Sequence, residues 1–386
     1  MARRSFRVLA GLAAAGVTAG GLAAVAPVAE AVSGALSFNC TVSAPYSSES
    51  GVFTAVMDTD APATMTPGQA VPLTVSSTVT IPSSLVDQIR ASGAYFVDGT
   101  SVAGATVDGV GRDANLVIPR IALPVAGGVP VGLPASGPAG TLTAGAVGTT
   151  VTLAAGDIEV LMHFYGASGA PFPGPVELLC TLAPAQNNVV DTVSVVPAAT
   201  STTVSVAGPV EYGDVPTATA DVAAGNQKPA GTVAFTFAGK TTSAAVKGGT
   251  AKADLAQALK MGANHVAAVF TPTDKALAPS QGTATFSVVR GPTTTTASAV
   301  YRAARHRLVG KATVAAVHGT DVAGKVKLVL KRDGIKVRVA IVDLNARDTA
   351  KKVFKHVRRA GQYTVVTRYR GSATLKRSSD RVKLTV

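Results

Sequence analysis

An internal repeat in the second half of the chain constrains the fold more than any other feature of the sequence. Residues 231–237, Gly-Thr-Val-Ala-Phe-Thr-Phe, correspond to residues 324–330, Gly-Lys-Val-Lys-Leu-Val-Leu, at an offset of 93. Further along the offset is 99, as shown by Phe270 and Tyr369. The change of six residues predicts one longer hairpin in the second copy, near residues 331–347.

Both copies consist of short segments in which apolar and polar residues alternate, and such a period of two is typical of half-buried β-strands. Each copy is about 90 residues long, which is the size of an immunoglobulin-like sandwich. Charged residues make up 15% of the chain and Trp is absent. β-Branched residues greatly outnumber the Glu, Gln, Lys and Leu that surface helices prefer. The sequence therefore predicts an all-β protein that ends in two immunoglobulin-like sandwiches.

The preceding region, residues 36–196, also alternates, with Gly and Pro at the expected turns. A short helix is predicted over Ser83–Ser92, where Leu85, Val86 and Ile89 have helical spacing after a serine cap. The remaining segments favour a further β-sandwich. The predicted organisation is a signal peptide, an N-terminal β-sandwich domain and two immunoglobulin-like domains, over residues 1–31, 32–198, 199–291 and 292–386.

Several motifs make the resemblance to known families more specific. Residues 229–235 (Pro-Ala-Gly-Thr-Val-Ala-Phe), 248–251 (Gly-Gly-Thr-Ala) and 361–371 resemble the bacterial Ig-like repeats that occur in tandem on secreted and surface proteins. The N-terminal region, with Val-Thr-Ile-Pro-Ser-Ser-Leu at 79–85, is similar to a domain of unknown function in secreted actinobacterial proteins. These resemblances imply an extracellular location and a fold, and they supply no activity.

The start of the chain predicts export. Three of the first seven residues are arginines, an apolar run over residues 8–28 follows, and residues 29–31 place small side chains where a signal peptidase cleaves, after Ala31. A membrane anchor is the alternative, and the glycines and proline within the run disfavour it. Arg3-Arg4 also resembles a twin-arginine signal, so both export routes stay open. No transmembrane segment is expected in the mature chain.

The chain has two cysteines, Cys40 and Cys180, and both fall in the apolar phase of an alternating segment. An even number of cysteines in an exported protein predicts a disulfide, here between two inward-facing thiols that could meet across the core. Two free buried thiols are the alternative. A metal site is less consistent with the sequence, because no clustered histidines complete a tetrahedral shell.

Candidate catalytic groups are sparse. The sequence has no nucleophile elbow, zinc-binding helix or phosphate-binding glycine loop, and its five histidines are scattered. Asp157, Glu159 and His163 share one strand face, which could be a carboxylate pair for glycoside hydrolysis, a weak cation site or simply a hydrated face. Asp58 and Asp60 lack the glycine and distal glutamate of a calcium loop. We therefore expect no enzymatic activity, cofactor or metal.

Charge is the feature with most functional content. Residues 292–386 contain 22 Lys or Arg against 5 Asp or Glu, a balance of +17, whereas the whole chain carries +13. Many of these cations alternate with core residues and could form an ordinary solvated sheet face. One sign chosen so consistently instead favours attraction to polyanions. The predicted polyanion-binding residues are Lys325, Lys327, Lys331, Lys336, Arg338, Lys351, Lys352, Lys355, Arg358, Arg359, Arg368 and Arg370.

The function predicted from these features is that of an exported, non-enzymatic envelope protein whose basic module binds anionic cell-envelope polymers. Specific nucleic-acid binding is not expected, because the basic module has few aromatic residues and no known reader motif. The alternative from another class is an extracellular adhesin. In that case residues 32–198 form a carbohydrate- or protein-binding head, and the two repeats serve as a stalk.

Overall fold

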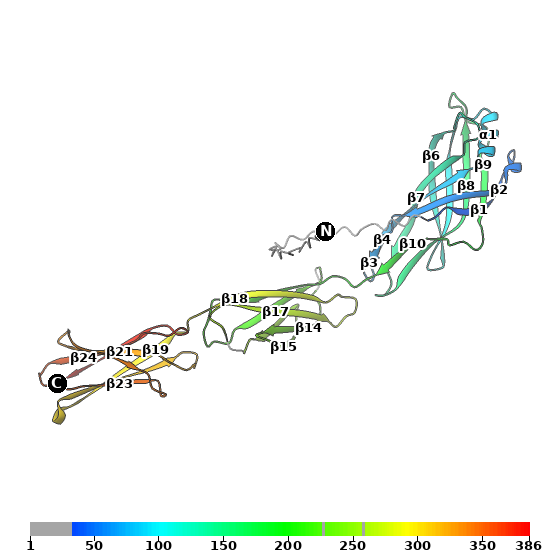
Figure 1. Ribbon diagram of the computed structural model, residues 1–386. Helices are drawn as coiled ribbons and strands as arrows, with labels where there is room; N and C mark the ends of the chain where they lie inside the picture. The colour runs from blue at the N-terminus through cyan, green and yellow to red at the C-terminus, as the bar shows by residue number, and fades with distance from the viewer. Residues whose placement is uncertain (1–32, 226–227, 257–258) are drawn as a thin grey trace, which may run out of the picture. The chain divides into compact units, whose positions relative to one another are not determined.

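The computed structural model describes residues 33–225, 228–256 and 259–386 (Figure 1). The predicted signal peptide, residues 1–31, lies outside these residues, as does its cleavage site. The chain divides into two compact units at the boundary between Val196 and Pro197. This boundary coincides with the start of the Pro-Ala-Ala-Thr segment at 197–200.

Strands dominate the first unit, as the alternating sequence predicts. They are β1 (Leu36–Val42), β2 (Gly51–Thr59), β3 (Thr64–Met65), β4 (Ala70–Ile81), β5 (Phe96–Val107), β6 (Val110–Ala122), β7 (Val131–Thr143), β8 (Thr150–Tyr165), β9 (Val176–Leu182) and β10 (Val189–Val195). The helices are the short 3-10 turn η1 (Ser47–Glu49) and α1 (Ser83–Ala91).

These strands form one ten-stranded sheet in the order β3-β10-β8-β5-β6-β7-β4-β2-β1-β9. Because β9 also pairs with β8, the hydrogen bonding continues around the domain and encloses a core. The inward residues of each strand are nearly inaccessible to solvent, for example Phe38, Phe53 and Met57. A layered all-β fold is confirmed, and the continuity of pairing between its layers is the feature that alternation alone did not predict.

The helix α1 lies at one end of these strands (Figure 1). Its residues Leu85, Val86 and Ile89 are buried in the core, so the predicted amphipathic helix is confirmed. The predicted serine cap is wrong. Pro82 occupies the position before the first helical residue, and no side chain caps the helix there. The backbone of Pro82 is extended, which is the conformation that starts a helix even without a side-chain hydrogen bond.

Cys40 and Cys180 form a disulfide, as predicted. β1 and β9 are antiparallel neighbours, and their register places the two cysteines directly opposite each other. The bond therefore joins adjacent strands of the sheet rather than crossing the core. It links positions 140 residues apart, so it ties the first strand of the domain to one of the last.

The first immunoglobulin-like module consists of β11 (Ser201–Val206), β12 (Val210–Glu211), β13 (Thr217–Ala223), β14 (Gly231–Phe237), β15 (Lys240–Ala245), β16 (Thr250–Asp254), β17 (Gly262–Pro272) and β18 (Ser280–Val289). One sheet has the order β11-β13-β16 and the other β12-β18-β17-β14-β15. Their facing residues, including Val233, Phe235 and Phe270, form the core between the two sheets.

The second module repeats this arrangement with β19 (Thr293–Arg302), η2 (Ala303–Arg305), β20 (Arg307–Ala316), β21 (Lys325–Arg332), β22 (Ile335–Asp343), β23 (Thr349–Phe354), β24 (Gln362–Tyr369) and β25 (Ser378–Thr385). Its sheets are β19-β20-β23 and β22-β21-β24-β25. Val326, Leu328 and Tyr369 occupy core positions corresponding to Val233, Phe235 and Phe270.

The longer hairpin that the offset predicts is β21–β22. The edge strand β22 has nine residues, whereas the corresponding strand β15 has six. The described chain is therefore all-β, with two immunoglobulin-like sandwiches at its C-terminal end, as the sequence predicts. No helix in the described ranges has both the length and the apolar composition that crossing a membrane requires.

Candidate functional site

The cations of the second module alternate with its core residues, and this alternation determines where each one points. On β21, Val326, Leu328 and Leu330 are fully buried, so Lys327 and Lys331 face outward from the four-stranded sheet. The register places Arg368 of β24 directly opposite Lys327. Three of the predicted polyanion-binding residues thus lie together on the outer face of this sheet.

On the edge strand β22, Arg338 is in line with the half-buried Ala340 and Val342, on the side that faces the other sheet. A register shift beside Leu330 places Lys336 directly opposite Lys331. The hairpin extends past the end of the core, so these two positions face solvent and accommodate charges. The Arg338 guanidinium donates a hydrogen bond to the carbonyl oxygen of Lys355, in the loop that follows β23.

The hairpin and this loop enclose a groove with a volume of about 520 Å³. Its apolar lining is formed by Leu330, Val337, Val357 and Tyr363. The Tyr363 hydroxyl donates to the Arg359 carbonyl oxygen at 2.9 Å. The polar residues around it are all basic, and none of the described residues lining the groove is acidic. They are Arg332, Lys336, Arg338, His356, Arg358 and Arg359.

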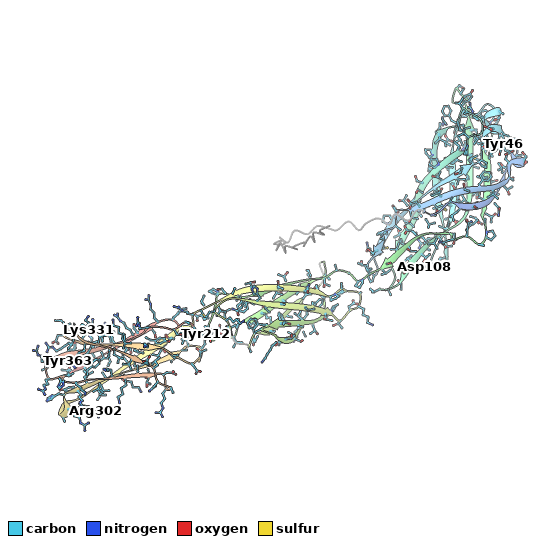
Figure 2. The ribbon with its side chains drawn as sticks, viewed as in Figure 1. Tyr46, Asp108, Tyr212, Arg302, Lys331 and Tyr363 are labelled. Atoms are coloured by element: carbon cyan, nitrogen blue, oxygen red, sulfur yellow. A yellow bond between two sulfur atoms is a disulfide. The ribbon has the colours of Figure 1, made fainter. Side chains whose placement is uncertain are left out.

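Lys351 lies elsewhere, on the outer face of the three-stranded sheet. It is directly opposite Lys311, and together with Arg302 and Arg347 the pair borders a depression of about 670 Å³. Figure 2 shows Arg302 and Lys331, which belong to the two different sheets of this module. Positive charge therefore covers both outer faces as well as the groove.

The structure distributes the predicted cations over three surfaces and does not gather them at one site. Lys336, Arg338, Arg358 and Arg359 line the groove, while Lys352, Lys355 and Arg370 are exposed near the edges of the sheets. Lys325 lies 3.6 Å from Asp343. It is the only one of the twelve predicted residues within ion-pair distance of a carboxylate in the described structure, so the other cations remain available to an external anion.

Sequence reasoning missed Arg332 and His356 in the groove and Arg302, Lys311 and Arg347 beside Lys351. Arg332 continues the inward phase of Val326, Leu328 and Leu330, so alternation placed it inside. The β21–β22 hairpin extends beyond the end of the core at this point. An inward-facing side chain there lines the groove and is not buried. An inward-phase cation at the end of a strand was the signal that could have revealed it.

The acidic candidates on β8 face outward as expected, with Gly156 at an irregularity in the pairing of β8 with β5. Asp157 accepts a hydrogen bond from the Leu182 backbone at 2.8 Å, and the His163 ring lies 4.0 Å from an oxygen of Asp98. Within the described ranges, no group of three or more His, Cys, Asp or Glu residues is arranged to hold a metal ion. Asp157 therefore has a structural role as a link between β8 and β9.

Asp58 and Asp60 likewise serve the backbone. Asp58 accepts from the amide of Thr59 at 2.9 Å, and Asp60 accepts from the amide of Thr74 at 2.6 Å. Asp58 lies within β2, and the Thr74 amide that Asp60 contacts belongs to the neighbouring strand β4, so both carboxylates have structural hydrogen bonds to the backbone.

Part of the first unit resembles a known protein family. Residues 37–191 match a family of unknown function, DUF6801. The resemblance to a domain of unknown function is confirmed in that form, and the match supplies no activity. No curated protein sequence matches the chain.

Solved structures with similar folds include several adhesins. The tetra-tandem repeat from the extending region of a large adhesion protein is 13% identical, covering 90% of this chain and 92% of that one with a TM-score of 0.28. A bacterial ice-binding adhesin is 13% identical, covering 81% and 90% with a TM-score of 0.26. The adhesin InvE of Yersinia pseudotuberculosis is 14% identical, covering 48% and 58% with a TM-score of 0.21. At these identities and scores the likeness concerns the fold alone.

Proposed function

We propose that the protein is an exported, non-enzymatic envelope protein whose last module binds anionic envelope polymers electrostatically. The first immunoglobulin-like module acts as a spacer in this proposal. The observation that carries it is the groove of the second module, where Lys336, Arg338, Arg358 and Arg359 gather around an apolar base with no acidic residue among the described lining. Phosphate or carboxylate groups of a polymer could enter this groove in succession.

The remaining cations strengthen the same interaction at longer range. A module with 22 basic and 5 acidic residues repels itself and attracts polyanions of any class. Surface charges are screened beyond about 8 Å at physiological ionic strength. Binding of this kind is therefore expected to weaken steeply as salt rises.

The test measures retention of the full mature chain on isolated cell walls of the producing organism and on polyphosphate-coated beads. The groove variant combines Lys336→Gln, Arg338→Gln, Arg358→Gln and Arg359→Gln. At low salt it should bind on the order of a thousandfold more weakly, since each Lys or Arg near an anionic surface contributes about 1 kcal/mol. Its thermal unfolding should match that of the parent, because all four side chains are exposed.

The first module offers a matched control with the same change in net charge. Lys240→Gln, Lys247→Gln, Lys252→Gln and Lys275→Gln also remove four exposed cations, and retention should fall by no more than about twofold because these charges lie outside the basic module. Equal losses in the two variants, or retention that does not respond to salt, would contradict electrostatic binding at the groove.

A further inference from the structure

The outer face of the four-stranded sheet in the second module exposes a row of large aliphatic side chains. Ile335, Val337, Val339 and Ile341 of β22 have exposed fractions of 74%, 50%, 44% and 54%. Val339 and Ile341 point to the outer face of the sheet, since they lie opposite Val329 and Lys327. A register shift beside Leu330 interrupts the alternation, so Ile335 and Val337 lie along the exposed edge near the start of the strand. At about 3.3 Å per residue, the four side chains form an apolar stripe along roughly 20 Å of this edge strand.

This stripe belongs to the hairpin that distinguishes the two modules. β22 is the last strand of its sheet and pairs only with β21, where Val329 lies opposite Val339 and Lys327 opposite Ile341. In the first module, the positions corresponding to Val339 and Ile341 are Thr241 and Ser243 of β15. The same place in the fold is thus polar in one module and apolar in the other.

Cations border the stripe across the rest of the sheet. Lys327 and Lys331 follow on β21, Arg368 on β24, and Arg381 and Lys383 on β25, all in the outward phase. The acidic residue on this face, Asp343, lies at the far end of β22 and pairs with Lys325 at 3.6 Å. The face therefore combines an uncovered apolar edge with an adjoining positive surface.

We propose that this face docks on the surface of a lipid bilayer that contains anionic phospholipids. The aliphatic side chains would enter the boundary between head groups and acyl chains, while the cations pair with lipid phosphates. Long Lys and Arg side chains suit this geometry, because their apolar stems can lie along the boundary as their charges reach the head groups.

Other occupants fit the face less well. A second copy of the chain would bring Lys327, Arg368 and their neighbours against like charges, which disfavours association. A hydrophilic anionic polymer would pair with the cations but leave the aliphatic stripe in water. Lipid docking therefore goes beyond polymer binding at the groove, and of the four aliphatic side chains only Val337 also lines the groove.

The absence of Trp from the sequence allows a direct test with a single-Trp reporter. The full mature chain carrying Ile341→Trp is mixed with vesicles of phosphatidylcholine alone or with added phosphatidylglycerol. We expect the Trp emission to shift to the blue only with the anionic vesicles, as the indole leaves water. A matched reporter, Val117→Trp on the exposed side of β6 in the first domain (62% exposed), should show no shift.

Binding itself is measured by vesicle co-sedimentation of a chain carrying Ile335→Thr, Val339→Thr and Ile341→Thr, none of which lines the groove. Threonine keeps the β-branched shape and the strand preference while adding a hydroxyl. The expected loss of affinity for anionic vesicles is at least about tenfold, since three exposed aliphatic groups no longer enter the bilayer boundary. Polyphosphate retention should be unchanged.

The control variant Val52→Thr, Val110→Thr and Val117→Thr changes three comparably exposed valines of the first domain and should bind vesicles like the parent. The proposal is overturned if the β22 variant also binds anionic vesicles like the parent, or if the Ile341→Trp emission does not shift. Failure of polymer binding at the groove would leave these vesicle results standing, so the two proposals can fail separately.

Discussion

The two immunoglobulin-like modules share a fold and differ in surface chemistry. In each, a Ser of the last strand bonds to a Thr of the first: Thr202 and Ser280 at 2.7 Å, and Thr295 and Ser378 at 2.6 Å. Outside these shared contacts, residues 199–291 carry 7 basic and 5 acidic residues, whereas residues 292–386 carry 22 and 5. The two modules have equal numbers of acidic residues, so their difference in net charge arises entirely from the additional Lys and Arg of the second module.

This difference in surface charge shows that different requirements determine the residues at the core positions and at the outward positions of a sandwich. Inward positions must fill the space between two sheets, which keeps Val, Phe, Leu and Tyr in corresponding places. Outward positions are free to change, and in the second module they became cationic and, on β22, aliphatic. The added length of the hairpin supplies the edge on which this occurs.

The largest expected effect concerns the corresponding core positions Phe270 and Tyr369, which have exposed fractions of 0% and 1%. Replacing either by Ala should cost about 3–5 kcal/mol, because the cavity cannot collapse fully. Chemical denaturation with mapping of protease cleavage sites should show each substitution unfolding its own module. Only Tyr369→Ala should also abolish polyphosphate retention. Equal loss of retention with Phe270→Ala would show that the basic module does not act alone.

A smaller effect is expected for the hydroxyl that distinguishes these two side chains. Tyr369 donates to the carbonyl oxygen of Ala323 at 2.7 Å, a contact for which Phe270 has no hydroxyl. Tyr369→Phe should therefore destabilise the second module by about 1 kcal/mol, the net contribution of one hydrogen bond. The denaturant midpoint of the full chain would reveal this loss of stability. Tyr363→Phe is a companion variant, because the Tyr363 hydroxyl bonds to a carbonyl oxygen of the groove loop. No change in either midpoint would mean that water replaces both contacts.

Most of the fold could be predicted from the sequence because period-two alternation directly reports which residues face inward. The repeat offset located the longer hairpin, and the phase of Cys40 and Cys180 indicated their disulfide. Alternation contains no information on which strands are neighbours. The pairing of β8 with β9 and the adjacent-strand position of the disulfide depend on that choice.

The candidate site was less predictable, because the sequence indicates the side to which a cation points but not where the core ends. Arg332 and Arg338 share the inward phase of a hairpin that extends beyond the core, and a register shift beside them brings Lys336 into the same groove, which alternation could not anticipate. For the same reason, alternation alone predicts that the aliphatic residues of β22 are ordinary core residues, although they are exposed. Their exposure follows from the position of β22 at the sheet edge, which only the tertiary structure gives.

The smallest expected effect concerns how each module joins its last strand to its first. A Cβ at Gly282 of the first module would collide with the carbonyl oxygen of Thr202, so the strands meet there by close backbone approach. The corresponding residue of the second module is Asp380, whose carboxylate accepts from the Ala297 amide at 2.8 Å. Backbone hydrogen bonds from Ala297 and then Arg381 hold the pKa of Asp380 below its usual value.

A carboxyl group whose pKa is lower in the folded state stabilises that state above its ordinary pKa, and this contribution disappears as the pH falls through the lowered value. Asp380→Asn should therefore lower the stability of the second module at neutral pH by less than about 1 kcal/mol, since solvent screens this half-exposed group. It should also flatten the acid limb of thermal unfolding measured from neutral pH to about pH 3. Protease mapping assigns the change to one module, because Gly282 gives the first module no titratable group at this position. An acid limb identical in parent and variant would show that the Asp380 carboxylate does not couple the strands.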